Sequence, residues 1–162
     1  MSLRLSPPQL LTVTHHLTGF QCGDAGLDDW LKRRALVNQT SGASRTFVVT
    51  DRDGNVLGYY ALAAGAVSHQ LARGDVRRNM PDPIPVIVLG RLAVDHRVQG
   101  MKVGAALLQD AINRALAVSR NAGVRAVVVH ALDDRAKCFY EHYGFRSSPL
   151  NPMTLMLRLP NL

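Results

Sequence analysis

In PVIVLGRLAVDHRVQGMKVGAALL (residues 85–108), an apolar run leads directly into a glycine-containing turn and a helical pattern, and this order indicates the fold. The first part of this stretch, residues 85–94, has almost no polar side chains, which is typical of a strand buried on both faces in the middle of a sheet. Apolar residues at helical spacing follow, so we expect a helix from about Val103 to Ala122 with Gly123 as its C-cap. The stretch predicts a central strand that enters a helix N-terminus.

The turn between this strand and this helix is suited to bind an anion. A helix N-terminus presents unpaired backbone N–H groups and the positive end of the helix dipole. Gly100 lets the backbone approach a ligand, Gly104 relieves crowding on the helix, and Arg97 offers a charge-assisted contact, so a diphosphate fits. The patterns GxxxxGK[ST] and GxGxxG are absent, which disfavours ATP and NAD. Taken alone, the motif is equally compatible with an ordinary strand-to-helix turn.

The rest of the chain predicts a mixed sheet with further helices. Asp24 is expected to cap a helix that turns Leu27, Trp30, Leu31 and Val37 inward. Residues 68–85 contain several arginines and prolines and predict a basic, exposed connection with at most a short helix. The other predicted elements are a strand near residues 10–14, a hairpin of residues 45–50 and 56–63, a strand at 125–132, a helix at 134–142 and a strand at 153–159. Together they predict an α+β domain with parallel and antiparallel strands.

Length, charge and cysteine content narrow the class of protein. The 162 residues suit one domain, 1–162, with a sizeable core. No apolar run reaches the length of a membrane span and no signal peptide is evident, so we expect a cytoplasmic protein without membrane contact. Cys22 and Cys138 show no metal-ligand spacing, which predicts reduced thiols and no metal. The net charge of +7 favours a polyanionic partner, although a solvated basic surface explains it equally well.

Two motifs resemble those of the GNAT superfamily of acetyltransferases. Arg97 and Gly100 match the first two fixed positions of its acetyl-CoA signature [QR]xxGx[GA], whereas Lys102 departs from the third. Downstream, HALDDRAKCFYEHYGF (residues 130–145) matches the signature AxxFYxxxGF, with Asp133 where many relatives have asparagine. The resemblance implies a GNAT fold, with a mixed central sheet of about six to seven strands, splayed central parallel strands and about four flanking helices.

The resemblance also implies acetyl-CoA as cofactor and assigns residues to it. The backbone of the central strand would pair with the pantetheine arm, and the turn would hold the pyrophosphate. The implied cofactor-binding residues are Leu92, Ala93, Val94, Arg97, Val98, Gln99, Gly100, Met101, Lys102, Val103, Gly104 and Asp133. For Lys102 two interpretations stay open, an amide contact alone or an additional ionic contact from its ammonium group.

Tyr140 is the predicted catalytic residue. In the family, the aligned hydroxyl lies near the thioester sulfur, where a phenol that is neutral at pH 7 can protonate the departing thiolate. Tyr143 lacks a motif match and Tyr59 lies in the hairpin, so both are poorer candidates, while Phe139 and Phe145 read as core aromatics.

The acceptor is predicted to be an amine of low pKa. Residues 86–94 contain no aspartate, glutamate or histidine that could deprotonate a lysine, whereas an α-amine with a pKa near 8 is substantially neutral already. His130, His96 or water could still serve as base. With the basic charge, this favours an α-amine carried by a polyanion, such as aminoacyl-tRNA.

Over essentially its whole length, the chain is similar to the GNAT toxins of bacterial toxin–antitoxin modules. The similarity includes LDDWLKRRALVNQ (27–39), GASRTFVV (42–49), GYYALAAG (58–65), RRNMPDPIPVIVLGRLAVD (77–95) and MTLMLRLP (153–160). It implies acetylation of aminoacyl-tRNA with arrest of translation, a homodimer, a ribbon-helix-helix antitoxin, and operator DNA bound only through the antitoxin complex. The preferred tRNA and the dimer interface are not encoded in these motifs.

Eight basic residues are candidate tRNA contacts. An exposed arginine is usually only solvated, so clustering beside the acceptor site would be needed to give these residues a role. Arg91 differs, because an arginine at the end of an apolar strand needs partners. The candidates are Lys32, Arg33, Arg34, Arg45, Arg73, Arg77, Arg78 and Arg91. Two alternatives remain, a GNAT enzyme for a small amine or protein N-terminus, and a binding module without catalysis.

Overall fold

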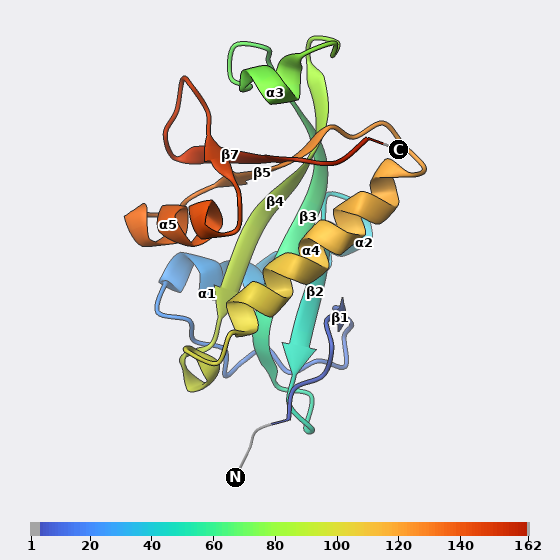
Figure 1. Cartoon of the computed structure of the whole chain (residues 1–162). Helices are drawn as coiled ribbons and strands as arrows, with labels where there is room; N and C mark the ends of the chain where they lie inside the picture. The colour runs from blue at the N-terminus through green and yellow to red at the C-terminus, as the bar shows by residue number, and fades with distance from the viewer. Residues whose placement is uncertain (1–3, 162) are drawn as a thin grey trace. The chain divides into compact units, whose positions relative to one another are not determined.

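The computed structural model describes residues 4–161, which form an α+β fold (Figure 1). The strands are β1 (Gln9–Leu10), β2 (Arg45–Thr50), β3 (Val56–Val67), β4 (Ile84–Val94), β5 (Ala126–His130), β6 (Arg146–Ser147) and β7 (Thr154–Arg158). The helices are α1 (Ala25–Arg33), α2 (Ala35–Ser41), α3 (Gly74–Arg77), α4 (Val103–Ser119) and α5 (Asp134–His142), with a 3₁₀ helix η1 (His96–Val98). Residues 4–161 thus contain five α-helices, whereas about four were expected.

The strands form one seven-stranded sheet in the order β1-β2-β3-β4-β5-β7-β6. β4 and β5 are parallel, from the pair Val86 and Ala126 to the pair Leu89 and Val129. β2 pairs antiparallel with β1 and β3, and β7 with β5 and β6. The predicted mixed sheet is therefore confirmed, and the parallel ladder ends at Leu89 although β4 continues to Val94.

The chain packs as two compact units, the first of residues 4–63 and 91–111 and the second of residues 64–90 and 112–161. The core of the first unit has Phe20, Leu31 and Tyr59 at its centre. Asp24 caps α1 as predicted, because its carboxylate accepts a hydrogen bond from the N–H of Leu27 at 2.9 Å.

One prediction for the first helix is wrong. Val37 was expected to point inward, yet its side chain is 53% exposed. The reason is that α1 ends at Arg33 and a separate helix begins at Ala35, so the helical spacing counted from Leu27 does not continue to Val37.

In the second unit, α3 and the adjoining loop pack on β4, β5 and β7 through Ala72, Val76, Ile84, Val128 and Met156. The connection between β3 and β4 contains one short helix, within the predicted limit, but the buried side chains of Ala72 and Val76 show that it is not exposed throughout as expected. Several boundaries differ from those expected: β1 is shorter, β3 is longer, and α4 ends at Ser119, so Gly123 is not its C-cap. β6 was not predicted, because two residues are too short to show a strand pattern.

None of the helices in residues 4–161 combines the length and the apolar character that crossing a lipid bilayer requires.

Candidate active site and cofactor turn

The predicted phosphate turn lies in the first unit, between the end of β4 and α4. η1 occupies residues 96–98, and two residues before α4 adopt left-handed backbone conformations, Gly100 with φ of 80° and Lys102 with φ of 63°. A left-handed conformation costs a non-glycine residue about 1 kcal/mol or more. Lys102 therefore keeps this backbone conformation at an energetic cost, which glycine, one of the two residues of the signature at this position, would avoid.

Replacing Lys102 with glycine is expected to raise the free energy of unfolding by about 0.5–1 kcal/mol, because glycine adopts the left-handed conformation without steric strain. Urea denaturation would measure this, with Met101→Gly as the control. Met101 is exposed like Lys102 but has no positive φ, so its replacement should destabilise the protein. Equal destabilisation by both changes would contradict the strain at Lys102.

The backbone of the turn offers several hydrogen-bond donors. Within residues 4–161, no acceptor is recorded for the N–H groups of Gln99, Gly100, Lys102, Val103 and Gly104. These groups precede or begin α4, where the helix dipole is positive. The turn therefore has the donor set that a diphosphate requires.

Arg97 is held by Asp95 in a bidentate pair. Its Nε donates to one carboxylate oxygen of Asp95 at 2.9 Å and its Nη2 to the other at 3.1 Å, and Nη2 also lies 3.4 Å from the carbonyl oxygen of Gly19. Among the described residues, only Nη1 has no recorded partner. The guanidinium group is half exposed, so a phosphate contact through Nη1 would leave the pair with Asp95 intact.

Asp95 is a structural residue of this turn that the sequence reasoning missed. Its carboxylate is 1% exposed and also accepts hydrogen bonds from the backbone N–H groups of Gln21 and Arg97, each at 2.9 Å. Burial alone would raise the pKa of Asp95, but the Arg97 side chain and these two N–H groups lower it to about 2. An aspartate placed directly after a buried strand and two residues before an arginine is the signal that could have identified it.

This pKa predicts a loss of stability in acid. A carboxylate whose pKa is lowered by folding stabilises the protein above its unfolded pKa, near 4, and loses that contribution as the pH falls toward 2. We expect Asp95 to contribute about 2 kcal/mol at pH 7 that disappears between pH 4 and 2. Urea titrations at several pH values would measure it. In Asp95→Asn this part of the pH dependence should be missing, and an unchanged acid profile would contradict the assignment.

Tyr140 lies in the second unit, near the end of α5. Its ring is 8% exposed and packs edge-on against Phe139 and Phe145, with centroid distances of 5.2 and 5.5 Å. Burial raises the pKa of Tyr140 to about 12. No hydrogen-bond partner of its hydroxyl is recorded within residues 4–161. The hydroxyl therefore stays protonated at neutral pH and remains available to a ligand.

The other tyrosine candidates have different environments. Tyr59 is buried, and its hydroxyl donates to the carbonyl of Leu27 at 2.7 Å, so this hydroxyl already has a structural partner. Tyr143 is 42% exposed beside Phe139. Phe145 is a core residue as predicted, whereas Phe139 is only half-buried.

Asp133 and the candidate bases also have defined partners. The Asp133 carboxylate caps α5 by accepting from the N–H of Ala136 at 2.8 Å, which an asparagine would do equally well. His130 Nδ1 lies 3.0 Å from Thr154 Oγ1, and His96 Nε2 lies 3.3 Å from Gln21 Oε1. No group of three or more potential metal ligands occurs within residues 4–161.

The remaining cofactor candidates, Leu92, Ala93 and Val94, end β4 in the first unit. Ala93 is buried in the core, and the Val94 carbonyl accepts from Gln99 Nε2 at 2.9 Å. Val98, at the end of η1, is fully buried, and Met101 is 52% exposed.

The basic candidates are distributed over both units. In the first unit, Arg34 contacts Asn38, Arg45 donates to the carbonyl of Gln39 at 2.9 Å, and Arg91 lies 4.4 Å above the ring of Trp30, a cation–π contact that provides its partner. Lys32 and Arg33 are exposed at the end of α1. Arg73, Arg77 and Arg78 belong to the second unit.

Comparison with known proteins identifies the family. Residues 43–147 match the model of the acetyltransferase (GNAT) domain. The chain is 51% identical to the tRNA-acetylating toxin of Mycobacterium tuberculosis over 152 residues, which cover 94% of this chain and 91% of that protein.

Solved structures of AtaT also match. AtaT complexed with acetyl-methionyl-tRNAfMet is 26% identical with a TM-score of 0.88, covering 96% of this chain and 95% of that one. A tyrosine-to-phenylalanine mutant of AtaT bound to acetyl-CoA and the C-terminus of the antitoxin AtaR is 27% identical with a TM-score of 0.80, covering 96% and 93%. An AtaT–AtaR complex bound to DNA is 27% identical with a TM-score of 0.76, covering 93% of each chain. The chain belongs to the GNAT acetyltransferase family.

Proposed function

We propose that this protein is an acetyl-CoA-dependent N-acetyltransferase toxin that acetylates the α-amine of aminoacyl-tRNA and thereby blocks translation. The observation that carries this proposal is the 51% identity to a tRNA-acetylating toxin over 94% of the chain. An identity of this extent includes the connecting segments outside the two acetyltransferase motifs, so it reaches beyond the fold and the cofactor.

Acetyl-CoA supplies the activated acetyl group, as a thioester. The residues of the turn fit its diphosphate, because the N–H groups of residues 99–104 include at least five without a recorded acceptor in the described chain, and α4 begins directly behind them. We assign the pyrophosphate to this turn and the pantetheine arm to the backbone of residues 92–94. Measuring the acetyl-CoA affinity of Lys102→Gly would separate the two interpretations of Lys102. The variant loses an ionic contact of the ammonium group but keeps a contact of the backbone amide, so a lower affinity indicates the ionic contact.

We assign Tyr140 as the general acid. When the amine attacks the thioester carbonyl, the C–N bond forms, the C–S bond breaks, and the sulfur needs a proton. The Tyr140 hydroxyl is protonated at neutral pH, because burial raises its pKa to about 12. Its Oη–H donates to the sulfur, and the proton released by the amine restores the phenol.

The α-amine of aminoacyl-tRNA suits a site without a carboxylate base on β4. Such an amine has a pKa of about 7.7–8.0, so a substantial fraction is unprotonated at neutral pH. We therefore expect kcat/KM to rise about tenfold per pH unit up to about pH 8 and then to stay level to pH 10. Tyr140 causes no decline in this range, since its pKa is about 12. A decline between pH 8 and 10 in initial-rate measurements would contradict the assignment of Tyr140.

The basic residues are proposed to contact the tRNA backbone. Lys32 and Arg33 at the end of α1, and Arg77 and Arg78 after β3, are exposed without a recorded ion pair within residues 4–161. Arg34 and Arg45 each already make a hydrogen bond to a neighbouring group, and Nε of Arg73 lies 3.6 Å from the Asp75 carboxylate. Binding of this kind weakens steeply with salt.

The partners proposed are those of the matched toxins. A ribbon-helix-helix antitoxin would neutralise the enzyme, and the toxin–antitoxin complex would bind operator DNA through the antitoxin. We further propose a homodimer, a cytoplasmic location, and a single acetyltransferase domain over residues 1–162. The family match supports the single domain, since it covers parts of both compact units.

Transfer of labelled acetyl groups from acetyl-CoA to a pool of charged tRNA tests the proposal. The proposal is supported if the label is released together with the amino acid when the ester bond to the tRNA is hydrolysed. The label should not be released as free acetate. If the protein binds acetyl-CoA but labels no tRNA, the substrate assignment is wrong, and the acceptor is a small amine or a protein N-terminus. If it does not bind acetyl-CoA, the enzymatic assignment is wrong as well.

A further inference from the structure

The connection between β3 and β4 is an ordered segment, here called the arch (residues 68–82), and α3 lies within it (Figure 1). The side chains of Ala72 and Val76 are completely or almost completely buried against β4, β5 and β7. His69 Nε2 donates to the carbonyls of Met80 and Pro81 at 2.9 and 2.8 Å. These hydrogen bonds connect the first residues of the arch with its last residues. The arch therefore has a fixed path although α3 is only four residues long.

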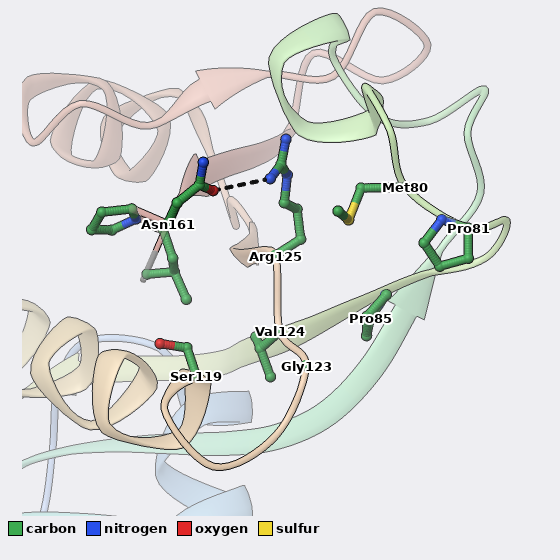
Figure 2. Close-up of a pocket in the computed structure, with 10 residues that line it drawn as sticks. Met80, Pro81, Pro85, Ser119, Gly123, Val124, Arg125 and Asn161 are labelled. Atoms are coloured by element: carbon green, nitrogen blue, oxygen red, sulfur yellow. Dashed lines mark hydrogen bonds between the residues drawn. The ribbon is translucent and has the colours of Figure 1, made fainter.

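Arg125, immediately before β5, contacts three backbone carbonyl groups of the arch. Its Nε donates to the carbonyl of Val76 at 3.0 Å, and its Nη2 to the carbonyls of Asp75 and Arg78 at 3.1 and 3.3 Å. Figure 2 shows the same guanidinium group directed toward Asn161, whose Oδ1 lies 3.5 Å from Nη1. A single planar group thus holds the backbone at two residues of α3 and at the residue that follows it.

These contacts supply the stabilising hydrogen bonds that a longer helix would form within its own backbone. One helical turn is unstable in isolation, because its residues are ordered at the cost of chain entropy with few hydrogen bonds in return. Ser148 adds a further contact, since its Oγ donates to the carbonyl of Leu71 at 2.5 Å. The backbone of the arch is consequently held by the side chains of Arg125, just before β5, and Ser148, in the loop after β6.

The arch presents a pair of arginines to solvent. Arg77 and Arg78 are exposed, and no ion pair with an acid is recorded for either within residues 4–161. Arg73 differs, because its Nε lies 3.6 Å from the Asp75 carboxylate. Consecutive arginines on a backbone that is already held in place can bind phosphodiester groups at a lower entropic cost than arginines on a disordered loop.

We propose that Arg125 is a positioning residue for tRNA binding: it holds α3 so that Arg77 and Arg78 are oriented toward the phosphate backbone before the tRNA arrives. Arg125 itself does not contact the nucleic acid. This inference rests on the proposed function, because it assumes that aminoacyl-tRNA is the substrate. It predicts that loss of Arg125 weakens tRNA binding even though the two contacting arginines remain.

The test compares Arg125→Leu with Arg158→Leu. Both changes remove one positive charge from the same neighbourhood, but Arg158 makes no recorded contact with the arch; it contacts Asn161 at 3.3 Å. For Arg125→Leu we expect the Kd for aminoacyl-tRNA to rise about tenfold and the slope of log Kd against log salt to fall by about 1 to 2, the value for one or two lost phosphate contacts. KM for tRNA should rise with kcat nearly unchanged, and acetyl-CoA affinity should not change.

The control variant, Arg158→Leu, should change the Kd for aminoacyl-tRNA less than threefold.

A double-mutant cycle separates positioning from direct contact. In a chain that already carries Arg77→Ala and Arg78→Ala, Arg125→Leu should have little further effect on tRNA affinity, because the residues it positions are gone. Hydrogen exchange of the amides of residues 71–79 should be faster in Arg125→Leu and unchanged in Arg158→Leu. Additive effects in the cycle would overturn the proposal, since they would mean that Arg125 acts independently of the pair.

Two further variants cover the case in which Arg125→Leu does not fold. Arg125→Lys keeps the charge but loses the planar fork, and Ser148→Ala removes the contact with Leu71; each should produce a smaller loss of tRNA affinity of the same kind. If the wild-type protein binds tRNA with a clear salt dependence and none of these variants alters it, the inference is wrong while the proposed function stands. If the wild-type protein does not bind tRNA, the proposed substrate is itself wrong.

Discussion

Replacing Tyr140 with phenylalanine is expected to lower kcat for acetyl transfer to aminoacyl-tRNA by roughly 10²- to 10⁴-fold, the usual contribution of a general acid. The change removes a hydroxyl oxygen for which no hydrogen-bond partner is recorded within residues 4–161. It leaves the packing of the ring against Phe139 and Phe145 unaltered. Stability and acetyl-CoA affinity should therefore stay close to those of the wild type. Single-turnover rates with labelled acetyl-CoA and charged tRNA would measure the effect.

Tyr143→Phe is the matched control for this prediction. Tyr143 follows α5 and packs against Phe139 as Tyr140 does, but its side chain is 42% exposed. We expect Tyr143→Phe to change kcat less than threefold, because the exposed Tyr143 hydroxyl is not expected to contact the reacting atoms. Should Tyr140→Phe keep full activity, or should both variants lose activity equally, Tyr140 would not be the proton donor.

Replacing Asp95 with alanine is expected to lower the free energy of unfolding by about 2–4 kcal/mol, because it leaves two backbone N–H groups and the half-exposed Arg97 guanidinium group without an acceptor. The carboxylate accepts four hydrogen bonds, from the backbone N–H groups of Gln21 and Arg97 and from Nε and Nη2 of Arg97. Through these bonds, Asp95 connects the loop before α1 with the start of the phosphate turn. Urea denaturation at pH 7 would give the change in stability.

The conservative variant Asp95→Asn distinguishes loss of charge from loss of all acceptors. Its amide oxygen can still accept one or two of the four hydrogen bonds, so it should be less destabilising than Asp95→Ala. The alanine variant should also weaken acetyl-CoA binding, since the turn loses the contact that orders Arg97. A destabilisation below about 1 kcal/mol for Asp95→Ala, the usual effect of a surface substitution, would be incompatible with this role.

The central elements were predictable because their patterns are long and regular. Residues 85–94 and 125–132 are apolar runs bounded by turns, and they form the parallel strands β4 and β5. The α5 helix was predicted at its observed bounds, because the Asp133 cap and a turn at Gly144, whose φ is 94°, delimit it. Where the helical spacing was interrupted, at Arg34, the prediction for Val37 failed.

The strand-to-helix turn, the family and the candidate residues could all be predicted from the sequence, because motif spacing and local periodicity are properties of neighbouring residues. The partners of those residues could be identified only in the folded structure. The pairing of Asp95 with Gln21 and the contacts of Arg125 with residues 75, 76 and 78 join positions about 50 to 75 residues apart. Such contacts depend on how strands and loops pack, and no local pattern encodes them. The raised pKa of Tyr140 likewise arises from burial, which the fold creates.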